Sequence, residues 1–173
     1  QDLHIIEKEH SFNANTGVVM GADKWIDFHY HKNSNDCINL LKNQGYHIIA
    51  TTPHPDKNIG TGKNDCLLES FDISQKTAFF FGEENTGLSK EAIDNADGFL
   101  KIPMFGFTES FNISVTVALV LHHLTMKLRK SKKINWKLTE EEMIEKRIDW
   151  ATKTITKGEE LVKYFFTRKE GSS

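Results

Sequence analysis

The chain has 173 residues, 38% of them hydrophobic and 27% charged, which is an ordinary globular balance and enough length for one α/β domain with a core. Its net charge of −2 excludes a strong positive field over the whole protein, which would indicate nucleic-acid binding. Local patches of charged residues can still steer ligands. Cys37 and Cys66 are the only cysteines, and they form neither a disulfide framework nor a zinc spacing. No apolar run approaches membrane-spanning length, so we expect a cytoplasmic protein with reduced thiols and no membrane partner.

Apolar runs alternate with helical patterns through most of the chain. In chain order, the expected strands cover residues 3–6, 25–30, 47–51, 77–81 and 99–102. The expected helices cover residues 34–43, 89–95 and 112–130, with Gly45 as the stop of the first and Ser89 as the N-cap of the second. Strands separated by helices favour an α/β fold with a parallel sheet covered on both faces. A strand pattern at the very first residues also suggests that chain is missing before it.

The C-terminal part has a different pattern. Thr139 and Glu142 have the spacing of a capping box, and apolar residues then recur at helical spacing on both sides of Gly158. We therefore expect two domains: an α/β domain at residues 1–131 and a helical extension at residues 132–173. The apolar stripes of the extension must pack on the α/β domain or on a partner subunit.

Two glycine-containing segments, residues 81–89 and 102–114, each follow a strand pattern and precede a helical one. Because glycine lets the backbone approach a ligand and strand ends meet at one edge of a sheet, we expect the segments to build one binding site. In that site, Gly82 would leave room for the ligand. There is no Lys after the second glycine as in a P-loop, and no GxGxxG opens a helix after the first strand. The residues alone thus favour a small-molecule or nucleotide site.

These two segments also resemble a known family. Residues 81–89, Phe-Gly-Glu-Glu-Asn-Thr-Gly-Leu-Ser, resemble the second motif of the SPOUT, or α/β-knot, RNA 2′-O-ribose methyltransferases. Residues 102–114, which contain the run Ser-Phe-Asn-Ile-Ser, resemble the third motif. Residues 21–25, 41–46 and 50–52 are similar to the family as well, and the helical tail resembles the tRNA guanosine-18 ribose methyltransferase branch.

The resemblance implies a parallel sheet flanked by helices, a C-terminal trefoil knot, and S-adenosylmethionine held in a bent form by the knot loops. The implied cofactor contacts are Thr51, Gly82, Ile102 and Phe111. The implied catalytic support beside the reacting ribose comes from Ser110, Asn112 and Glu84.

Structural alternatives stay open for these residues. Ile102 and Phe111 fit an apolar slot for adenine, but core packing would also explain them. Glu84 can hold its own loop, and Asn112 can cap the helix that follows.

The implied reaction moves a methyl group to a ribose 2′-hydroxyl, which is a poor nucleophile until a base or a cation assists its deprotonation. The family assigns this role mainly to an Arg, next to an Asn, in its first motif. That motif lies upstream of the strand that residues 3–6 resemble, and the sequence begins after it. We therefore expect residues 1–173 to bind S-adenosylmethionine but to transfer methyl groups slowly on their own.

The expected substrate is tRNA, and the expected assembly is a homodimer formed through the knot. A basic cluster at the end of the long helix is expected to contact RNA phosphates: Lys127, Arg129, Lys130, Lys132 and Lys133. The alternative for this cluster is a solvated helix end, where cations suit the helix dipole. The histidine pairs lack carboxylate or thiol partners, so no metal is expected.

Other functions remain open at this stage. They are ribose methylation of ribosomal RNA, an inert knotted module that binds RNA, and a nucleotide-binding α/β protein unrelated to methyl transfer.

Overall fold

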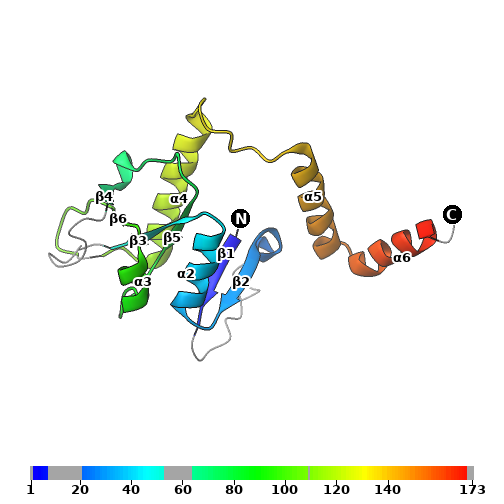
Figure 1. The fold of residues 1–173 in the computed structure, drawn as a ribbon, viewed down its shortest axis with the longest axis horizontal. Coiled ribbons are helices and arrows are strands. Elements are labelled where there is room, and N and C mark those ends of the chain that lie inside the picture. The colour runs from blue at the N-terminus through cyan, green and yellow to red at the C-terminus, as the bar shows by residue number, and fades with distance from the viewer. Residues whose placement is uncertain (1, 8–20, 53–63, 109, 171–173) are drawn as a thin grey trace. The chain divides into compact units, whose positions relative to one another are not determined.

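The computed structural model describes residues 2–7, 21–52, 64–108 and 110–170 (Figure 1). The chain divides into two compact units: His31–Trp136, and Gln1–Tyr30 together with Lys137–Ser173. The boundary that the sequence suggests, between residues 131 and 132, stays a prediction. No helix of the described residues is both long and apolar enough to cross a membrane.

The larger unit is built on a four-stranded parallel sheet. Its strands lie in the order β4-β6-β3-β5 and comprise β3 (His47–Thr51), β4 (Asn64–Leu67), β5 (Thr77–Phe80) and β6 (Gly98–Lys101). This confirms the predicted α/β class and three of the predicted strands to within a residue at each end. Strand β4 was not predicted, because its four residues, Asn-Asp-Cys-Leu, are too few to show a strand pattern and begin with two polar residues.

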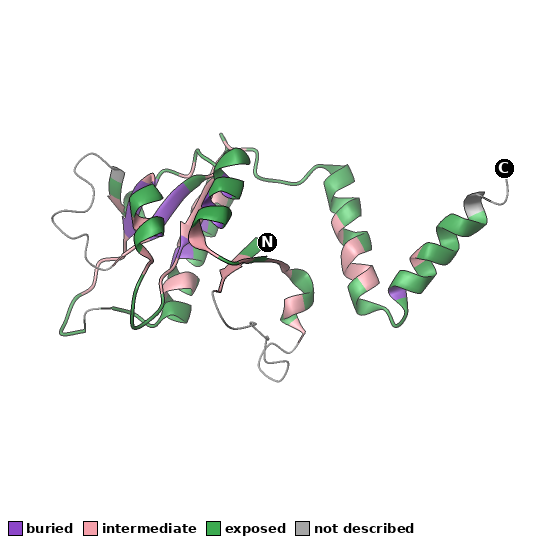
Figure 2. Ribbon diagram, turned by 60° about the horizontal axis from the view of Figure 1, so that its bottom comes forward, coloured by how far each residue is buried: buried purple, intermediate pink, exposed green. Residues whose placement is uncertain are grey.

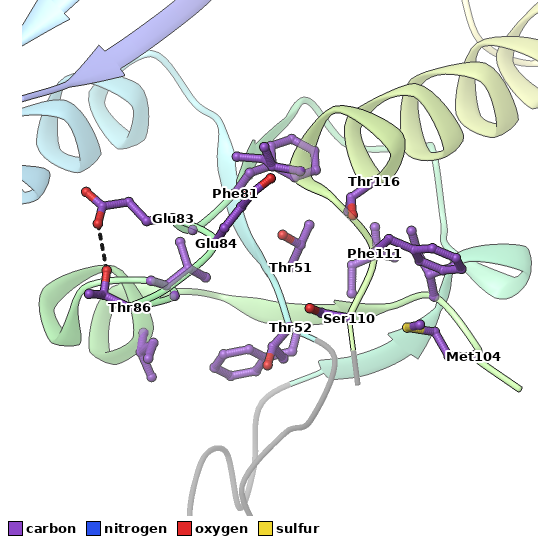
Figure 3. Close-up of a pocket in the computed structure, with 18 residues that line it drawn as sticks. Thr51, Thr52, Phe81, Glu83, Glu84, Thr86, Met104, Ser110, Phe111 and Thr116 are labelled. Carbon is purple, nitrogen blue, oxygen red and sulfur yellow. Dashed lines mark hydrogen bonds between the residues drawn. The ribbon is translucent and has the colours of Figure 1, made fainter. Parts of the chain in front are cut away.

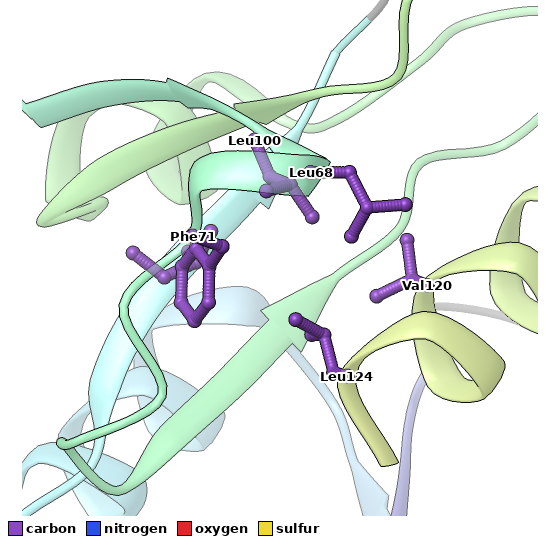
Figure 4. Packing of buried hydrophobic residues seen from close by; sticks show 6 residues of the cluster. Leu68, Phe71, Leu100, Val120 and Leu124 are labelled. Atoms are coloured by element: carbon purple, nitrogen blue, oxygen red, sulfur yellow. The ribbon is translucent and has the colours of Figure 1, made fainter. Parts of the chain in front are cut away.

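One face of the sheet is covered by the long helix α4 (Ile113–Lys130). Ile49 of β3 and Leu100 of β6 point to this side, where they join Val120 and Leu124 of the helix in one buried cluster (Figure 4). Leu68 and Phe71, from the turn after β4, complete the cluster. Alternation along each strand therefore assigns every second residue to the α4 side.

The opposite face is covered by α2 (Ser34–Asn43) and α3 (Lys90–Asn95). Ala50 and Phe99, neighbours in register on β3 and β6, are buried on this side with Ala96. Cys37 of α2 is fully buried, and burial raises the pKa of its thiol to about 11, so it is a neutral packing group. Most of the buried residues, in purple, lie in this unit's sheet and its helices, in agreement with a sheet covered on both faces (Figure 2).

The predicted helix ends are confirmed. The Ser89 side chain caps α3 by accepting a hydrogen bond from the Ala92 amide at 3.2 Å. Gly45 follows α2 with φ 79°, a backbone conformation that favours glycine at a helix end.

The smaller unit contains a two-stranded sheet and two helices. Strand β1 (Asp2–Ile6) pairs with β2 (Asp27–His31), and a 3-10 turn at Ala22–Trp25 occupies the start of the strand that was predicted from residue 25. Helix α5 (Glu140–Thr154) begins with the predicted capping box between Thr139 and Glu142. Helix α6 (Gly158–Glu170) follows after a short turn.

Helix α5 packs on the N-terminal segment of its own unit. Trp150 meets Trp25 edge to face, with ring centroids 5.2 Å apart. Asp27 forms ion pairs with Lys146 and Lys153, and the pKa of its carboxyl is lowered, mainly by the Lys146 hydrogen bond. Trp150 therefore packs within its own unit, whereas Ile144, Ile148 and Ile155 of the predicted apolar stripe are 54%, 53% and 53% exposed.

Candidate functional site

A cavity of about 330 Å³ lies in the larger unit at the carboxyl ends of β3, β5 and β6 (Figure 3). Thr51 ends β3, Phe81 and Gly82 follow β5, and Ile102 follows β6. The start of α4 closes the ring. Ligands of open α/β sheets bind in such a crevice at the carboxyl ends of the strands, and this volume suits a small molecule.

All four predicted cofactor residues line this cavity: Thr51, Gly82, Ile102 and Phe111. The Thr51 hydroxyl donates to the Phe80 carbonyl oxygen at 2.9 Å, which leaves its oxygen free to accept from a ligand. Ile102 also packs against the buried α4 cluster, so the core-packing and the pocket-lining interpretations both hold for it. Phe111 is 38% exposed and belongs to no buried cluster of the described residues, which favours the pocket interpretation.

The loop after β5 is a tight backbone turn. Glu83 and Gly87 pair with each other through two backbone hydrogen bonds of 3.0 and 2.9 Å, and the Thr86 hydroxyl donates to the Glu83 carboxylate at 2.7 Å. A Cβ on Gly82 would lie 2.7 Å from the Gly87 carbonyl oxygen and closer still to the Leu88 nitrogen. We expected Gly82 to leave space for a ligand, but the structure shows that the loop's own backbone occupies that space.

A hydrogen-bond chain joins the two glycine-containing segments. The Asn112 side-chain amide donates to the Glu84 carboxylate at 2.5 Å. Its oxygen accepts from the Ser114 amide at 2.9 Å, which makes Asn112 the N-cap of α4. The structural alternative for Asn112, a helix cap, is therefore present in the molecule, whereas the Glu84 carboxylate bonds the capping side chain of the other segment rather than its own loop.

Of the three predicted catalytic residues, Ser110 and Glu84 line the cavity. Asn112 is not among the lining residues, and its side chain donates a hydrogen bond to Glu84. Sequence reasoning missed Thr52, Met104 and Thr116, which also line it. Thr116 lies one helical turn after Asn112 and donates to its carbonyl oxygen at 3.1 Å. That i, i+4 spacing was the signal that could have placed it at the site.

The lining combines apolar side chains, hydroxyl groups and two carboxylates. Figure 3 shows Thr51, Ser110 and Thr116 around the same space, on three different parts of the chain. Glu83 and Glu84 are the charged residues of the described lining, which contains no Lys, Arg or His. Such a surface suits an uncharged or cationic ligand with apolar and hydroxyl-bearing parts.

The predicted RNA-binding cluster lies away from this cavity, and its members differ in their surroundings. The half-buried Lys127 ammonium donates to the carbonyl oxygens of Glu69 at 3.3 Å and Phe71 at 2.5 Å, and so ties α4 to the turn after β4. The Arg129 guanidinium lies over the Trp136 ring, 6.0 Å from its centroid. Lys130, Lys132 and Lys133 are exposed.

Comparisons with known proteins identify the family of the chain. Residues 1–122 match the sequence model of the SpoU rRNA Methylase family. Over 154 residues the chain is 42% identical to the tRNA (guanosine(18)-2'-O)-methyltransferase of Borreliella burgdorferi, a match that covers 89% of this chain and 66% of that protein. The chain spans about half the length of several other curated relatives, such as those of Thermus thermophilus and Escherichia coli.

Solved structures show the same fold. The A. aeolicus TrmH/SpoU tRNA modifying enzyme superposes with a TM-score of 0.67 at 24% identity, covering 90% of this chain and 75% of that one. The SpoU methyltransferase AviRb from Streptomyces viridochromogenes, in complex with its cofactor AdoMet, gives a TM-score of 0.63 at 18% identity, covering 75% and 51%. The family model, the relatives and the fold agree with the resemblance of the two loop motifs: the chain belongs to the SpoU rRNA Methylase family.

Proposed function

We propose that the protein transfers a methyl group from S-adenosylmethionine to a ribose 2′-hydroxyl of tRNA. The observation that carries the proposal is the 42% identity, over 89% of the chain, to a relative named for this reaction at guanosine 18. We propose the same nucleotide as the target. A tRNA substrate also favours a cytoplasmic location.

The cavity fits this cofactor in the chemistry of its lining. Leu88, Ile102 and Phe111 offer an apolar surface for an adenine ring, and the hydroxyls of Thr51 and Thr116 can bond a ribose. The carboxylates of Glu83 and Glu84 favour a cationic group nearby. When bound, S-adenosylmethionine supplies an electrophilic methyl group on a positively charged sulfur.

The chain's own residues then bind and orient the two reactants. The Glu83–Gly87 turn fixes the loop after β5, and the bond from Asn112 to Glu84 holds the start of α4 against it. Ser110, exposed on the lining between Met104 and Phe111, is placed to bond the incoming ribose. Holding the two reactants in line is worth several kcal/mol of the barrier in such transfers.

Activation of the hydroxyl needs a further group. The described lining contains no basic side chain, and the family resemblance assigns this role to an Arg of the first motif. We propose that residues 1–173 supply the cofactor site and the positioning groups of this reaction.

We also propose that two copies pair through α4, the helix expected to thread the trefoil knot. Val115, Leu119 and Leu121 on this helix are 45%, 40% and 53% exposed, whereas Val120 and Leu124 already cover the sheet. A helix that is apolar on more than its core-facing side needs a second partner surface. Sedimentation at micromolar concentration should therefore show a dimer.

RNA contacts are proposed for the basic cluster. Lys130, Lys132 and Lys133 are exposed, so their ammonium groups can contact phosphates. The Arg129 guanidinium, which lies over the Trp136 ring, can contact a phosphate as well. Lys127 belongs to the cluster in sequence, although its ammonium already bonds two carbonyl oxygens.

The test combines cofactor binding with methyl transfer. Calorimetric titration should show S-adenosylmethionine binding, and tritium from the labelled cofactor should enter an unmodified tRNA transcript as 2′-O-methylguanosine. Phe111→Ala, at the cavity, should weaken cofactor binding. The matched control Tyr164→Ala, an exposed aromatic of α6, should not. Cofactor binding without transfer by a chain that includes the first motif would leave an RNA-binding module instead.

A further inference from the structure

The connection from β6 to α4 carries two phenyl rings in open solvent. Phe105 is 95% exposed and Phe107 is 107% exposed, the highest values among the large apolar side chains of the described residues. Phe is among the residue types most often buried, and two uncovered rings within three residues represent a large apolar surface exposed to water. Such a surface indicates a partner.

These rings are held at the edge of the cavity by the course of the chain. Met104, just before Phe105, lines the cavity, and so does Ser110, three residues after Phe107 (Figure 3). Neighbouring Cα atoms are about 3.8 Å apart. The Cα of Phe105 therefore lies one such step from the Cα of Met104, and the Cα of Phe107 lies within roughly 10 Å of the Cα of a lining residue. Gly106 between them has φ 127°, a conformation that favours glycine and sets a turn between the two rings.

The chemistry of the loop selects the kind of partner. Residues 102–108, Ile-Pro-Met-Phe-Gly-Phe-Thr, carry no charge, so this segment offers no cation that could form an ion pair with a phosphate. A phenyl ring has no hydrogen-bonding group, but it stacks on any nucleobase. The target ribose must enter the cavity beside this loop, and its own base and the neighbouring bases then lie within a few ångströms of the rim.

We propose that Phe105 and Phe107 form a stacking platform for the nucleobases that flank the target ribose, an inference that rests on the proposed function. The rings hold unstacked bases at the mouth of the cavity, while the basic cluster at the far end of α4 binds phosphates. The platform adds affinity without selecting a base, because every base has an aromatic face.

The test compares four proteins: wild type, Phe105→Ala/Phe107→Ala, Phe105→Leu/Phe107→Leu and Phe105→Tyr/Phe107→Tyr. Fluorescence anisotropy with an unmodified, labelled tRNA transcript measures binding across a salt series. Loss of a stacked ring should weaken tRNA binding roughly 5- to 150-fold per ring in the Ala variant. The Leu variant should be similarly weak, and the Tyr variant close to wild type. Because no phosphate contact is lost, the slope of affinity against salt should not change.

Three results would overturn the platform. They are unchanged tRNA affinity in the Ala variant, wild-type affinity in the Leu variant, or a change from dimer to monomer on sedimentation, which would mean that a second copy covers the rings. S-adenosylmethionine affinity and the thermal midpoint should stay at wild-type values throughout. A wild-type protein that binds tRNA but transfers no methyl group would instead contradict the proposed function, while leaving the stacking comparison intact.

Discussion

Adding a single methyl group at Gly82 should distort the cavity that we propose as the cofactor site. In Gly82→Ala, the new Cβ would be 2.7 Å from the Gly87 carbonyl oxygen and closer to two other backbone atoms, distances that real Cβ atoms do not show. The neighbours are backbone rather than flexible side-chain ends, so the Glu83–Gly87 turn must open. That turn forms the wall of the cavity after β5.

The cost can be estimated from overpacking elsewhere, which is typically about 1–3 kcal/mol. If the whole molecule bears this strain, the thermal midpoint of a chain of this size should fall by about 2–12 °C. If the strain is relieved by opening the loop, cofactor binding must close it again, and the affinity should fall roughly 5- to 150-fold. At least one of the two quantities has to change.

Calorimetric titration with S-adenosylmethionine and thermal unfolding measure both quantities. The control is Gly45→Asn, after α2 and outside the cavity lining. Gly45 has φ 79°, where Asn is tolerated, and a Cβ there meets nothing within 4 Å, so the change should cost no more than about 1 kcal/mol. Wild-type affinity together with a wild-type midpoint in Gly82→Ala would refute the tight-turn explanation. A loss of affinity at an unchanged midpoint would favour ligand contact or local loop opening.

Three further predictions follow from single contacts. Asn112→Ala should destabilise the protein by about 1 kcal/mol through loss of the α4 cap, and less than additively with Glu84→Gln in a double-mutant cycle; strict additivity would contradict the coupling. Lys127→Met should lower the thermal midpoint but leave unchanged the slope of log affinity for tRNA against log salt concentration. Lys132→Ala/Lys133→Ala should flatten that slope by roughly 0.7–0.9 per lost phosphate contact. The reverse pattern would show that Lys127 contacts the RNA. Asp27→Asn should lower the free energy of unfolding by about 0.5–1 kcal/mol at pH 7. Because the pKa of Asp27 is lowered in the folded protein, its contribution is present above about pH 4 and is lost as the pH falls through the folded pKa. Urea titrations should therefore show the free energies of unfolding of the two proteins converging in acid.

Much of the fold could be predicted because its signals are local. Each signal acts within four residues and was confirmed: the N-caps Ser89 and Asn112, Gly45 at the end of α2, and the Thr139–Glu142 capping box. Apolar strand runs separated by helical stripes were enough to predict a parallel sheet with both faces covered. Strand β4 was missed since its pairing with β6, rather than its own four residues, makes it a strand.

The candidate site was predictable in part of its membership but not in its contacts. The motifs named Thr51, Gly82, Ile102 and Phe111, and all four line one cavity. The bond between Asn112 and Glu84 joins residues 28 positions apart, and no periodicity predicts a contact of that separation. The close approach of Gly82 to Gly87 likewise depends on how the loop closes on itself.

The basic cluster shows the same limit. In the sequence, Lys127 looks like its neighbours, because charge and spacing are all that a sequence records. In the structure its ammonium is turned toward two carbonyl oxygens of the segment after β4, 56 and 58 residues away. Which cations of a run face solvent is decided by packing between distant segments.

The most direct test of the proposed function is a map of ribose methylation in tRNA from cells with and without the full-length gene, made nucleotide by nucleotide by mass spectrometry. We predict 2′-O-methylation of guanosine 18 in cells that carry the gene and its loss in cells that lack it, with other modifications unchanged. An identical tRNA methylation map in both, or a loss confined to ribosomal RNA, would contradict it.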